Sequence, residues 1–305
     1  MEFIKELFHL SYREGAALDK MAQAFKSMFS QGFSFKQITA SIMVIVEMLS
    51  FILFAIPMTP RGEALDLRGY TQVFCDDFNG SELDASVWNY RGSGARRGGY
   101  NSPNQVRLED GNLKIRAQYR EDGEFGPGWY VGMVSLREKY KQGYFEARCI
   151  CSDGSDFWSA FWIQADHPYE PEISKGGIGG AELDIFEAMN ADEKTGLKRN
   201  GVTSTIHCSG MTGDTSGGLN SRNLGTFRGK DIYRQYNTYG LKWTEDEYIF
   251  YINGVETVRS SFADGVSQVP EEVIVSLEIP DGEIHHDKDY STEFIIDYVK
   301  IWQKL

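Results

Sequence analysis

Between residues 67 and 302 the sequence keeps one pattern of short strand-forming runs and turn residues, and this pattern restricts the possible folds more than any other feature of the chain. Short runs of aromatic and β-branched residues are separated by Gly and Asn at intervals of about 8 to 12 residues, and few stretches have a helical period. Asn253 and Gly254 lie between two such runs, which predicts a hairpin with a type I′ turn. We therefore expect an all-β sandwich or jelly roll with few helices in this region.

A chain of 305 residues has room for one large β domain and an extension. No Pro-rich or Ser-rich linker and no internal repeat divides the strand-rich region, whereas the region before it has a helix-like composition. We predict an N-terminal helical extension over residues 1–61 and one β domain over residues 62–305. We also expect the protein to be a monomer.

Charge and cysteine content narrow the classes of function. The net charge of -13 argues against a nucleic-acid partner, because phosphate binding needs a basic stripe and the Lys and Arg residues here are scattered. The four cysteines are too few and too unevenly spaced for a disulfide scaffold, and they do not form a zinc-binding pattern. Free thiols are therefore expected.

Residues 38–56 form an apolar run that is interrupted by one charge, Glu47. As a helix this run would be about 28 Å long, close to the hydrocarbon thickness of a bilayer. It is consistent with a membrane anchor, with a secretory signal, or with a helix buried against the β domain. We favour an anchor or a signal, either of which would place the β domain outside the cell, secreted or membrane-anchored.

Residues 182–187 place three carboxylates in a segment whose apolar residues predict a covered strand. On a regular strand Glu182 and Asp184 share one face, and Glu187 points to the other. A β-bulge, which adds one residue to one strand, would bring all three acids onto one face. We expect this bulge between Asp184 and Glu187, because buried acids usually have a function or a partner.

Seven motifs resemble, in order, those of glycoside hydrolase family 16, in the laminarinase-like branch whose E-x-D-x-x-E strand is bulged. They are residues 74–80, Trp88, and residues 111–115, 143–148, 158–162, 182–187 and 297–299. The resemblance implies a concanavalin-like β-jelly-roll sandwich of two curved antiparallel sheets, with a polysaccharide cleft on the concave face. It also implies a structural calcium site that involves Asp77, Gly111 and Asp297, and no cofactor that the reaction requires.

The resemblance assigns the nucleophile to Glu182, the general acid and base to Glu187, and the position between them to Asp184. Retaining hydrolysis needs one ionised and one protonated carboxyl group roughly 5 to 5.5 Å apart. A third acid between them favours different protonation states, because like charges oppose ionisation. We predict a retaining endo-β-glycanase that cuts a polysaccharide, with β-1,3 or mixed β-1,3/1,4 glucan as the leading substrate.

Two further functions stay open. Met133 stands where laminarinase-like members carry a glucan-binding arginine, and Arg96 and Arg97 form the one basic cluster. These features favour an endo-β-galactosidase that acts on agar-like or mucin-type chains. Outside the enzymes, a jelly roll that binds glycans without cutting them is the alternative.

Sugar clefts combine aromatic faces with polar donors and acceptors, because one side of a pyranose is apolar. Core packing is the alternative for the tryptophans, and a structural role is the alternative for the histidine. The loop over residues 167–180 is expected to wall the cleft. The resemblance implies substrate contacts for Trp158, Trp162, His207 and Asn104. Further predicted substrate-binding residues are Arg97, Trp129 and Tyr130.

Overall fold

The computed structural model describes residues 57–189, 191–192, 197–198 and 200–304. The predicted extension, including residues 38–56, lies outside this part except for its last five residues. None of the helices in the described ranges is long and apolar enough to cross a membrane. Met58 pairs with Phe227 and Ala64 pairs with Val255, so the first described residues join the β domain.

Seven strands form one sheet of the sandwich, in the order β15-β14-β11-β10-β19-β8-β2. All neighbours in this sheet are antiparallel. The strands are β2 (Trp88–Tyr90), β8 (Met133–Tyr140), β10 (Trp158–Gln164), β11 (Glu182–Met189), β14 (Gly201–Ser209), β15 (Leu219–Arg228) and β19 (Glu271–Glu278).

Eleven strands form the second sheet, with the order β18-β17-β16-β9-β20-β6-β7-β4-β3, while β1 pairs with β20 and β5 with β6. Here β4 and β7 pair in parallel, which departs from the expected antiparallel arrangement. The strands are β1 (Thr71–Asp76), β3 (Gly94–Arg96), β4 (Gly99–Asn101), β5 (Val106–Glu109), β6 (Asn112–Arg120), β7 (Gly128–Val131), β9 (Gly143–Ile150), β16 (Asn237–Trp243), β17 (Tyr248–Ile252), β18 (Val255–Ser260) and β20 (Ser291–Gln303).

Little regular structure lies outside these two sheets in the described residues. The helical segments there are the 3-10 turn η1 (Pro103–Gln105) and the short helix α4 (Pro171–Ser174). A separate two-stranded pair is formed by β12 (Ala191–Asp192) and β13 (Leu197–Lys198). The expectation of few helices after residue 67 is confirmed for the described residues.

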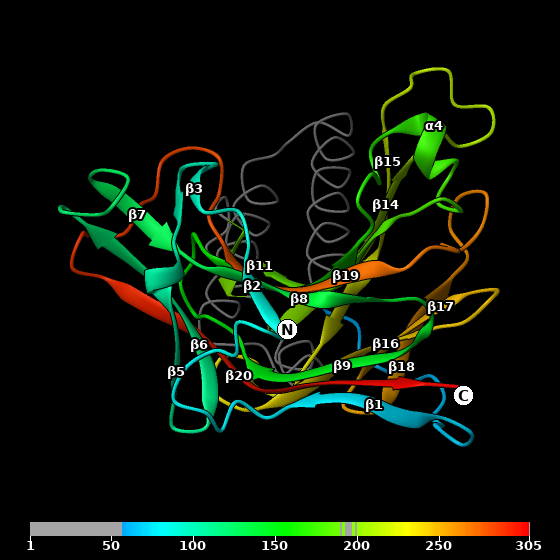
Figure 1. Ribbon diagram of the computed structural model, residues 1–305, viewed down its shortest axis with the longest axis horizontal. Coiled ribbons are helices and arrows are strands. Elements are labelled where there is room, and N and C mark those ends of the chain that lie inside the picture. The colour runs from blue at the N-terminus through cyan, green and yellow to red at the C-terminus, as the bar shows by residue number, and fades with distance from the viewer. Residues whose placement is uncertain (1–56, 190, 193–196, 199, 305) are drawn as a thin grey trace, which may run out of the picture. The chain divides into compact units, whose positions relative to one another are not determined.

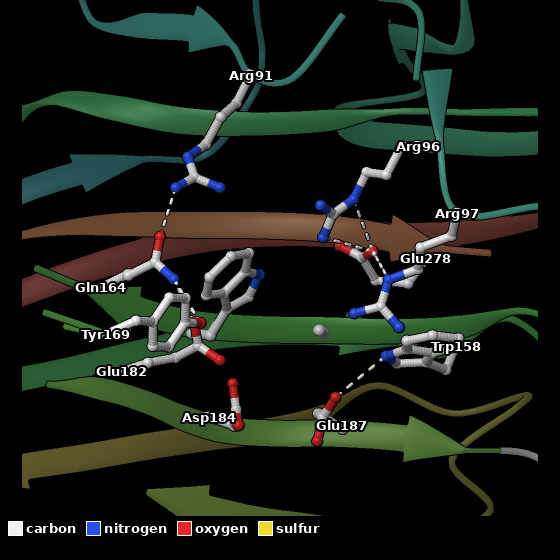
Figure 2. Close-up of a pocket in the computed structure, with 12 residues that line it drawn as sticks. Arg91, Arg96, Arg97, Trp158, Gln164, Tyr169, Glu182, Asp184, Glu187 and Glu278 are labelled. Atoms are coloured by element: carbon white, nitrogen blue, oxygen red, sulfur yellow. Dashed lines mark hydrogen bonds and ion pairs between the residues drawn. The ribbon is translucent and has the colours of Figure 1, made fainter. Parts of the chain in front are cut away.

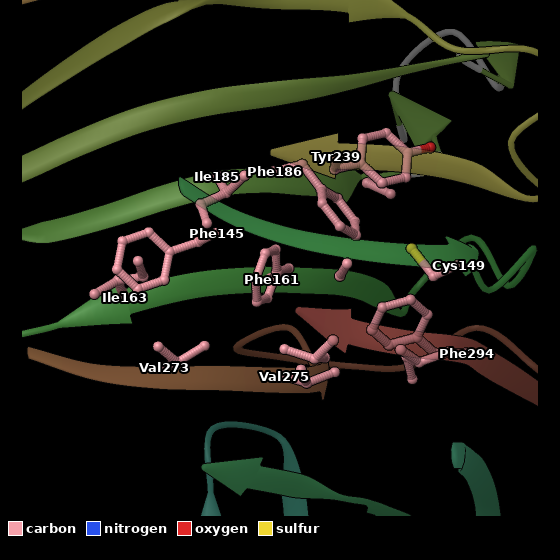
Figure 3. Close-up of a cluster of buried hydrophobic side chains, with 14 of the residues drawn as sticks. Phe145, Cys149, Phe161, Ile163, Ile185, Phe186, Tyr239, Val273, Val275 and Phe294 are labelled. Atoms are coloured by element: carbon pink, nitrogen blue, oxygen red, sulfur yellow. The ribbon is translucent and has the colours of Figure 1, made fainter. Parts of the chain in front are cut away.

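The two sheets form two layers (Figure 1), and the hydrophobic core lies between them (Figure 3). Side chains alternate along each strand, so every second residue of β10 and β19 enters this core. Phe161 and Ile163 of β10 and Val273 and Val275 of β19 are completely buried there. Burial of each such side chain stabilises the fold by about 1.5 to 3 kcal/mol. The intervening residues of the same strands face the other side of the seven-stranded sheet.

The predicted hairpin joins β17 to β18. Its two turn residues, Asn253 and Gly254, have φ angles of 51° and 73°. A type I′ turn requires positive φ at both central positions, which Asn and Gly tolerate better than other residues. The prediction is confirmed.

Candidate active site

The predicted bulge is present in β11. Asp184 pairs with Thr205 of β14, and Glu187 pairs with Thr203, so three steps on β11 face two steps on β14. On the other side, Trp162 and Phe161 are adjacent on β10 but pair with Asp184 and Phe186 of β11. The pairing therefore skips Ile185.

The bulge changes which side chains enter the core. Ile185 and Phe186 are adjacent in sequence, yet both belong to the core between the sheets. The alternation resumes one residue late, and Glu182, Asp184 and Glu187 line one pocket on the outer face of the seven-stranded sheet (Figure 2). The structure thus brings together the three predicted catalytic acids.

The three acids lie in surroundings that oppose ionisation. Burial, and then the charges of Asp184 and Glu182, raise the pKa of Glu187 to about 8. Burial and the neighbouring Asp184 also raise the pKa of Glu182, while hydrogen bonds from Tyr169 and Gln164 act in the opposite direction. Glu187 therefore favours the protonated form, and two donors stabilise the ionised form of Glu182.

His207 is the partner of the central acid. Its Nε2 lies 3.1 Å from Oδ2 of Asp184, and its Nδ1 lies 2.6 Å from Oγ of Ser221. Burial alone would lower the pKa of His207, but Asp184 and the two glutamates raise it. Burial raises the pKa of Asp184, and the contact with His207 acts to lower it. A positively charged His207 would hold Asp184 ionised between the glutamates.

Trp158 contacts the predicted general acid directly. Its indole Nε1 donates a hydrogen bond of 3.2 Å to Oε1 of Glu187. The guanidinium of Arg97 lies 4.9 Å from the ring centre of Trp158, in a cation–π arrangement. Arg96 and Arg97 both lie within ion-pair distance of Glu278, at 2.9 and 3.8 Å. The predicted Arg97 thus lines the pocket, although its charge is shared with Glu278.

Trp162 lies on the same face of β10 as Trp158. It pairs with Asp184 of β11, whereas Trp158 pairs with Met189. Its Nε1 donates to Oγ of Ser276 at 3.1 Å, and the Arg91 guanidinium lies 5.1 Å from its ring centre. Nη1 of Arg91 also lies 3.6 Å from the sulfur of Met133. Arg91 therefore brings a guanidinium next to the position where laminarinase-like members have their arginine.

Three other predicted substrate-binding residues lie outside this pocket. Trp129 and Tyr130 are only 7% and 1% exposed, because both rings pack against neighbouring aromatic side chains. Neither ring lines the pocket that holds the three acids. Asn104 is exposed on η1, where it donates to Glu124 at 3.3 Å.

The predicted calcium ligands do not gather their side chains around one point. Asp297 pairs with Arg148 at 2.5 Å, and Asp77 is exposed. Within the described ranges, the one group of three acidic, histidine or cysteine side chains close enough to share a metal is Glu182, Asp184 and His207. The calcium site stays a prediction that would depend on backbone oxygens.

Six residues that line the pocket were not among the predicted site residues: Arg91, Arg96, Ala160, Gln164, Tyr169 and Glu278. Gln164 and Glu278 could have been found by alternation, because Gln164 is two residues after Trp162 and Glu278 is two after Ser276, on faces that meet the pocket. Arg91 and Tyr169 lie outside strands, in segments without a periodic signal. Cys75, Cys149, Cys151 and Cys208 are free thiols, as expected.

Comparisons with known proteins agree with this geometry. Glucan endo-1,3-beta-glucosidase A1 of Niallia circulans is 26% identical over 220 residues, which cover 64% of this chain and 30% of that protein. Endo-1,3-1,4-beta-glycanase ExsH of Rhizobium meliloti (strain 1021) is 26% identical over 270 residues, which cover 78% and 53%. The chain thus spans 30% and 53% of the length of these two curated relatives.

The fold also matches solved structures. The crystal structure of SCLam, a non-specific endo-beta-1,3(4)-glucanase from family GH16, superposes with a TM-score of 0.64 at 22% identity, covering 82% of this chain and 97% of that one. This match confirms the expected jelly-roll class. The family model described as "Beta-porphyranase A-D, GH16 domain" matches residues 70–304. Because this match covers most of the sequence, the chain belongs to glycoside hydrolase family 16.

Proposed function

We propose that this protein is a retaining endo-β-glycanase. The observation that carries the proposal is the bulge at Ile185, which places Glu182, Asp184 and Glu187 in one pocket. Their surroundings separate the two glutamates chemically, since Glu187 has a pKa of about 8 and Glu182 receives two hydrogen bonds. One protonated and one ionised carboxyl group is the arrangement that retaining hydrolysis requires.

The reaction would proceed in two steps. Glu187 donates its proton to the glycosidic oxygen while a carboxylate oxygen of Glu182 attacks the anomeric carbon, so the aglycone leaves and a glycosyl ester forms. Glu187, now ionised, then takes a proton from water as that water attacks the same carbon and releases Glu182. Asp184 lies between the glutamates, and its ionised form would favour the return of the proton to Glu187.

We propose β-1,3 or mixed β-1,3/1,4 glucan as the substrate. The curated relatives that match this chain bear the names of β-1,3 and β-1,3-1,4 glycanases, which supports this choice. The pocket carries the aromatic and polar groups that such a glucan needs, in the rings of Trp158 and Trp162 beside Gln164.

An endo-β-galactosidase that acts on agar-like or mucin-type chains is the second candidate. The specific observation is the row of three arginines, Arg91, Arg96 and Arg97, that line the pocket of an otherwise acidic protein. The matching family model, described by the name of β-porphyranases, points in the same direction.

A panel of polysaccharides tests the proposal and separates the two substrates. Purified protein is incubated with laminarin, lichenan, agarose, porphyran and mucin glycans, and new reducing ends are measured. We expect cleavage of at least one member, with loss of more than about 10³-fold in Glu182→Gln, because the nucleophile is then absent. If no glycan in the panel is cut, the enzyme proposal is wrong.

The non-catalytic alternative makes a different prediction. If the protein only binds glycans, wild type and Glu182→Gln should bind a polysaccharide in an affinity gel equally well, and neither should release products. An enzyme loses product formation in this variant while it keeps most of its binding, because the carboxylate acts mainly in the transition state.

We also propose that the β domain lies outside the cell, through an anchor or signal at residues 38–56, and that the protein is a monomer. Protease added to intact cells should then degrade the domain, whereas degradation only after lysis would contradict this location.

Light scattering checks the monomer against the mass of 34.5 kDa. A fall in melting temperature on addition of EDTA would support the proposed calcium site.

A further inference from the structure

We propose that Tyr169 and Gln164 are positioning residues that hold one oxygen of the Glu182 carboxylate and leave the other oxygen to attack the sugar. This inference rests on the proposed function, because it assigns the geometry of the nucleophile in that reaction. Neither residue belongs to the acid motif: Gln164 ends β10, and Tyr169 lies on the loop before the catalytic strand.

Both donors reach the same atom. Nε2 of Gln164 and the phenol oxygen of Tyr169 each donate to Oε2 of Glu182, and Nε2 of Gln164 also donates to the phenol oxygen at 3.0 Å (Figure 2). Among the described residues no hydrogen bond reaches Oε1 of Glu182. The lone pairs of Oε1 are therefore free for attack on the anomeric carbon, while Oε2 is held.

The same contacts serve both states of the nucleophile. In the free enzyme they stabilise the negative charge of Glu182, which burial and Asp184 oppose. When Oε1 bonds to the sugar, Oε2 becomes the carbonyl oxygen of the ester and can still accept from Tyr169 and Gln164. The ester carbonyl is thereby polarised and ready for the attack of water on the anomeric carbon.

Arg91 determines which end of the Gln164 amide faces the nucleophile. Its Nη2 donates to Oε1 of Gln164 at 2.5 Å, and its Nε pairs with Glu272 at 3.0 Å. A guanidinium can only donate, so the amide oxygen must face Arg91 and the NH₂ group must face Glu182. This chain of contacts links a residue outside the strands to the nucleophile.

The loop that carries Tyr169 is packed firmly against the sheet. Ser174 Oγ donates to the carbonyl of Gly180 and accepts from the amide of Ser209 in β14. A Cβ at Gly179 would lie 1.8 Å from the carbonyl oxygen of Ile173, so only glycine fits there. Tyr169 itself stays 48% exposed at the mouth of the pocket, where a bound glycan would cover it.

Two variants test the inference, Tyr169→Phe and Gln164→Met, each of which removes a donor while it keeps the volume of the side chain. We expect kcat to fall by about 10- to 100-fold in each, with a much smaller change in KM, because the lost bonds act on the charged nucleophile. We also expect the acidic limb of the pH profile to move to higher pH, since both donors lower the pKa of Glu182. Neither variant replaces Asp184, Glu187 or His207, whereas Gln164→Met also removes the oxygen that accepts from Arg91.

Glu172→Gln is the matched control, because Glu172 is exposed on α4 of the same loop and does not line the pocket. Its kcat and pH profile should equal those of wild type. If Tyr169→Phe fails to fold, Gln164→Met carries the same test.

The outcomes separate this inference from the proposed function. If wild type cuts no glycan, the proposed function is wrong, and this inference, which rests on it, is wrong as well. If wild type cuts a glycan and both variants keep the wild-type kcat and acidic limb, only the inference is wrong. A fall in kcat without movement of the acidic limb would also overturn it, because a purely structural role predicts that result.

Discussion

The two glutamates of the site differ in the donors around them. Glu182 receives hydrogen bonds from Gln164 and Tyr169, whereas Glu187 receives one bond of 3.2 Å, from the indole of Trp158. Hydrogen bonds to a carboxylate favour its charged form, so the number of donors separates the two roles in the direction that the reaction needs.

Replacement of Trp158 by phenylalanine tests this difference at Glu187. The hydrogen bond from the indole of Trp158 lowers the pKa of Glu187. The variant keeps an aromatic ring but removes this donor, so the pKa of Glu187 should rise. We expect the basic limb of kcat/KM, near pH 8 in wild type, to move to higher pH. Trp302→Phe is the control, because Trp302 packs on Tyr144 in the other sheet. A basic limb that moves to lower pH would contradict the assignment of Glu187.

Single residues were correctly placed in the pocket where a strand fixed their direction. The three acids, Trp158 and Trp162 are examples, because strand alternation and the family motif both apply to them. Trp129 and Tyr130 were not, since an aromatic residue in a strand is consistent with either a sugar platform or the core. The cation–π contacts of Arg91 and Arg97 with the two cleft tryptophans could not be predicted, because such a contact has no sequence period.

At the level of elements, the bulge in β11 is the feature on which the site depends. It was predictable because the acids have the wrong parity for a regular strand, and only one inserted residue corrects it. The structure identifies that residue as Ile185.

Deletion of Ile185 tests the bulge. The shortened strand would have four steps from Glu182 to Glu187 and would pair regularly, so both glutamates would still face the pocket. We expect circular dichroism to report a β fold and activity to stay within about 10-fold of wild type. Ile185→Val keeps the bulge and should cost only about 0.5 to 1.5 kcal/mol of stability with activity retained. A deletion variant that folds but loses more than about 10³-fold of activity would contradict the account.

The loop between β10 and β11 marks the limit of prediction for elements. Its position before the catalytic strand predicted a wall of the cleft, and Tyr169 does line the pocket. The contact of Tyr169 with the nucleophile could not be predicted, because a loop of this length has no period that assigns a direction to its side chains. The same is true of Arg91, which follows β2.

For the whole β domain, one buried acid couples stability to pH. Glu271 is completely buried, and its Oε1 accepts from the amide of Ala181 at 3.0 Å. Burial raises its pKa from 4.5 to about 8. A raised pKa means that the stabilising contribution is complete below pH 4.5 and is lost as the pH rises towards 8.

We therefore expect the melting temperature of wild type to fall between about pH 5 and pH 8, and Glu271 to account for at most about 5 kcal/mol of the lost free energy of unfolding. Glu271→Gln cannot ionise and keeps an oxygen for Ala181, so its melting temperature should change less over this range. Glu245→Gln, on an exposed turn, is the control and should follow wild type. Identical slopes for wild type and Glu271→Gln would contradict the prediction.

The domain as a whole could be predicted because its strands repeat one pattern and its motifs occur in the family order. The sandwich, the hairpin at Asn253 and the bulge are confirmed, while residues 1–56 lie outside the described part. Arg91 of the pocket pairs with Glu272, and the two residues are 181 apart in the sequence and meet only in the folded sheet. No local pattern reports such a pair.

The stereochemistry of cleavage tests the central claim most directly. Proton NMR is used to follow the first minutes of hydrolysis of whichever glycan in the panel is cut, before mutarotation mixes the anomers. Attack by Glu182 followed by attack of water inverts the anomeric carbon twice, so the account predicts that the β-anomer appears first and the α-anomer only later. An initial signal from the α-anomer would show a single displacement by water and would contradict the roles assigned to Glu182 and Glu187.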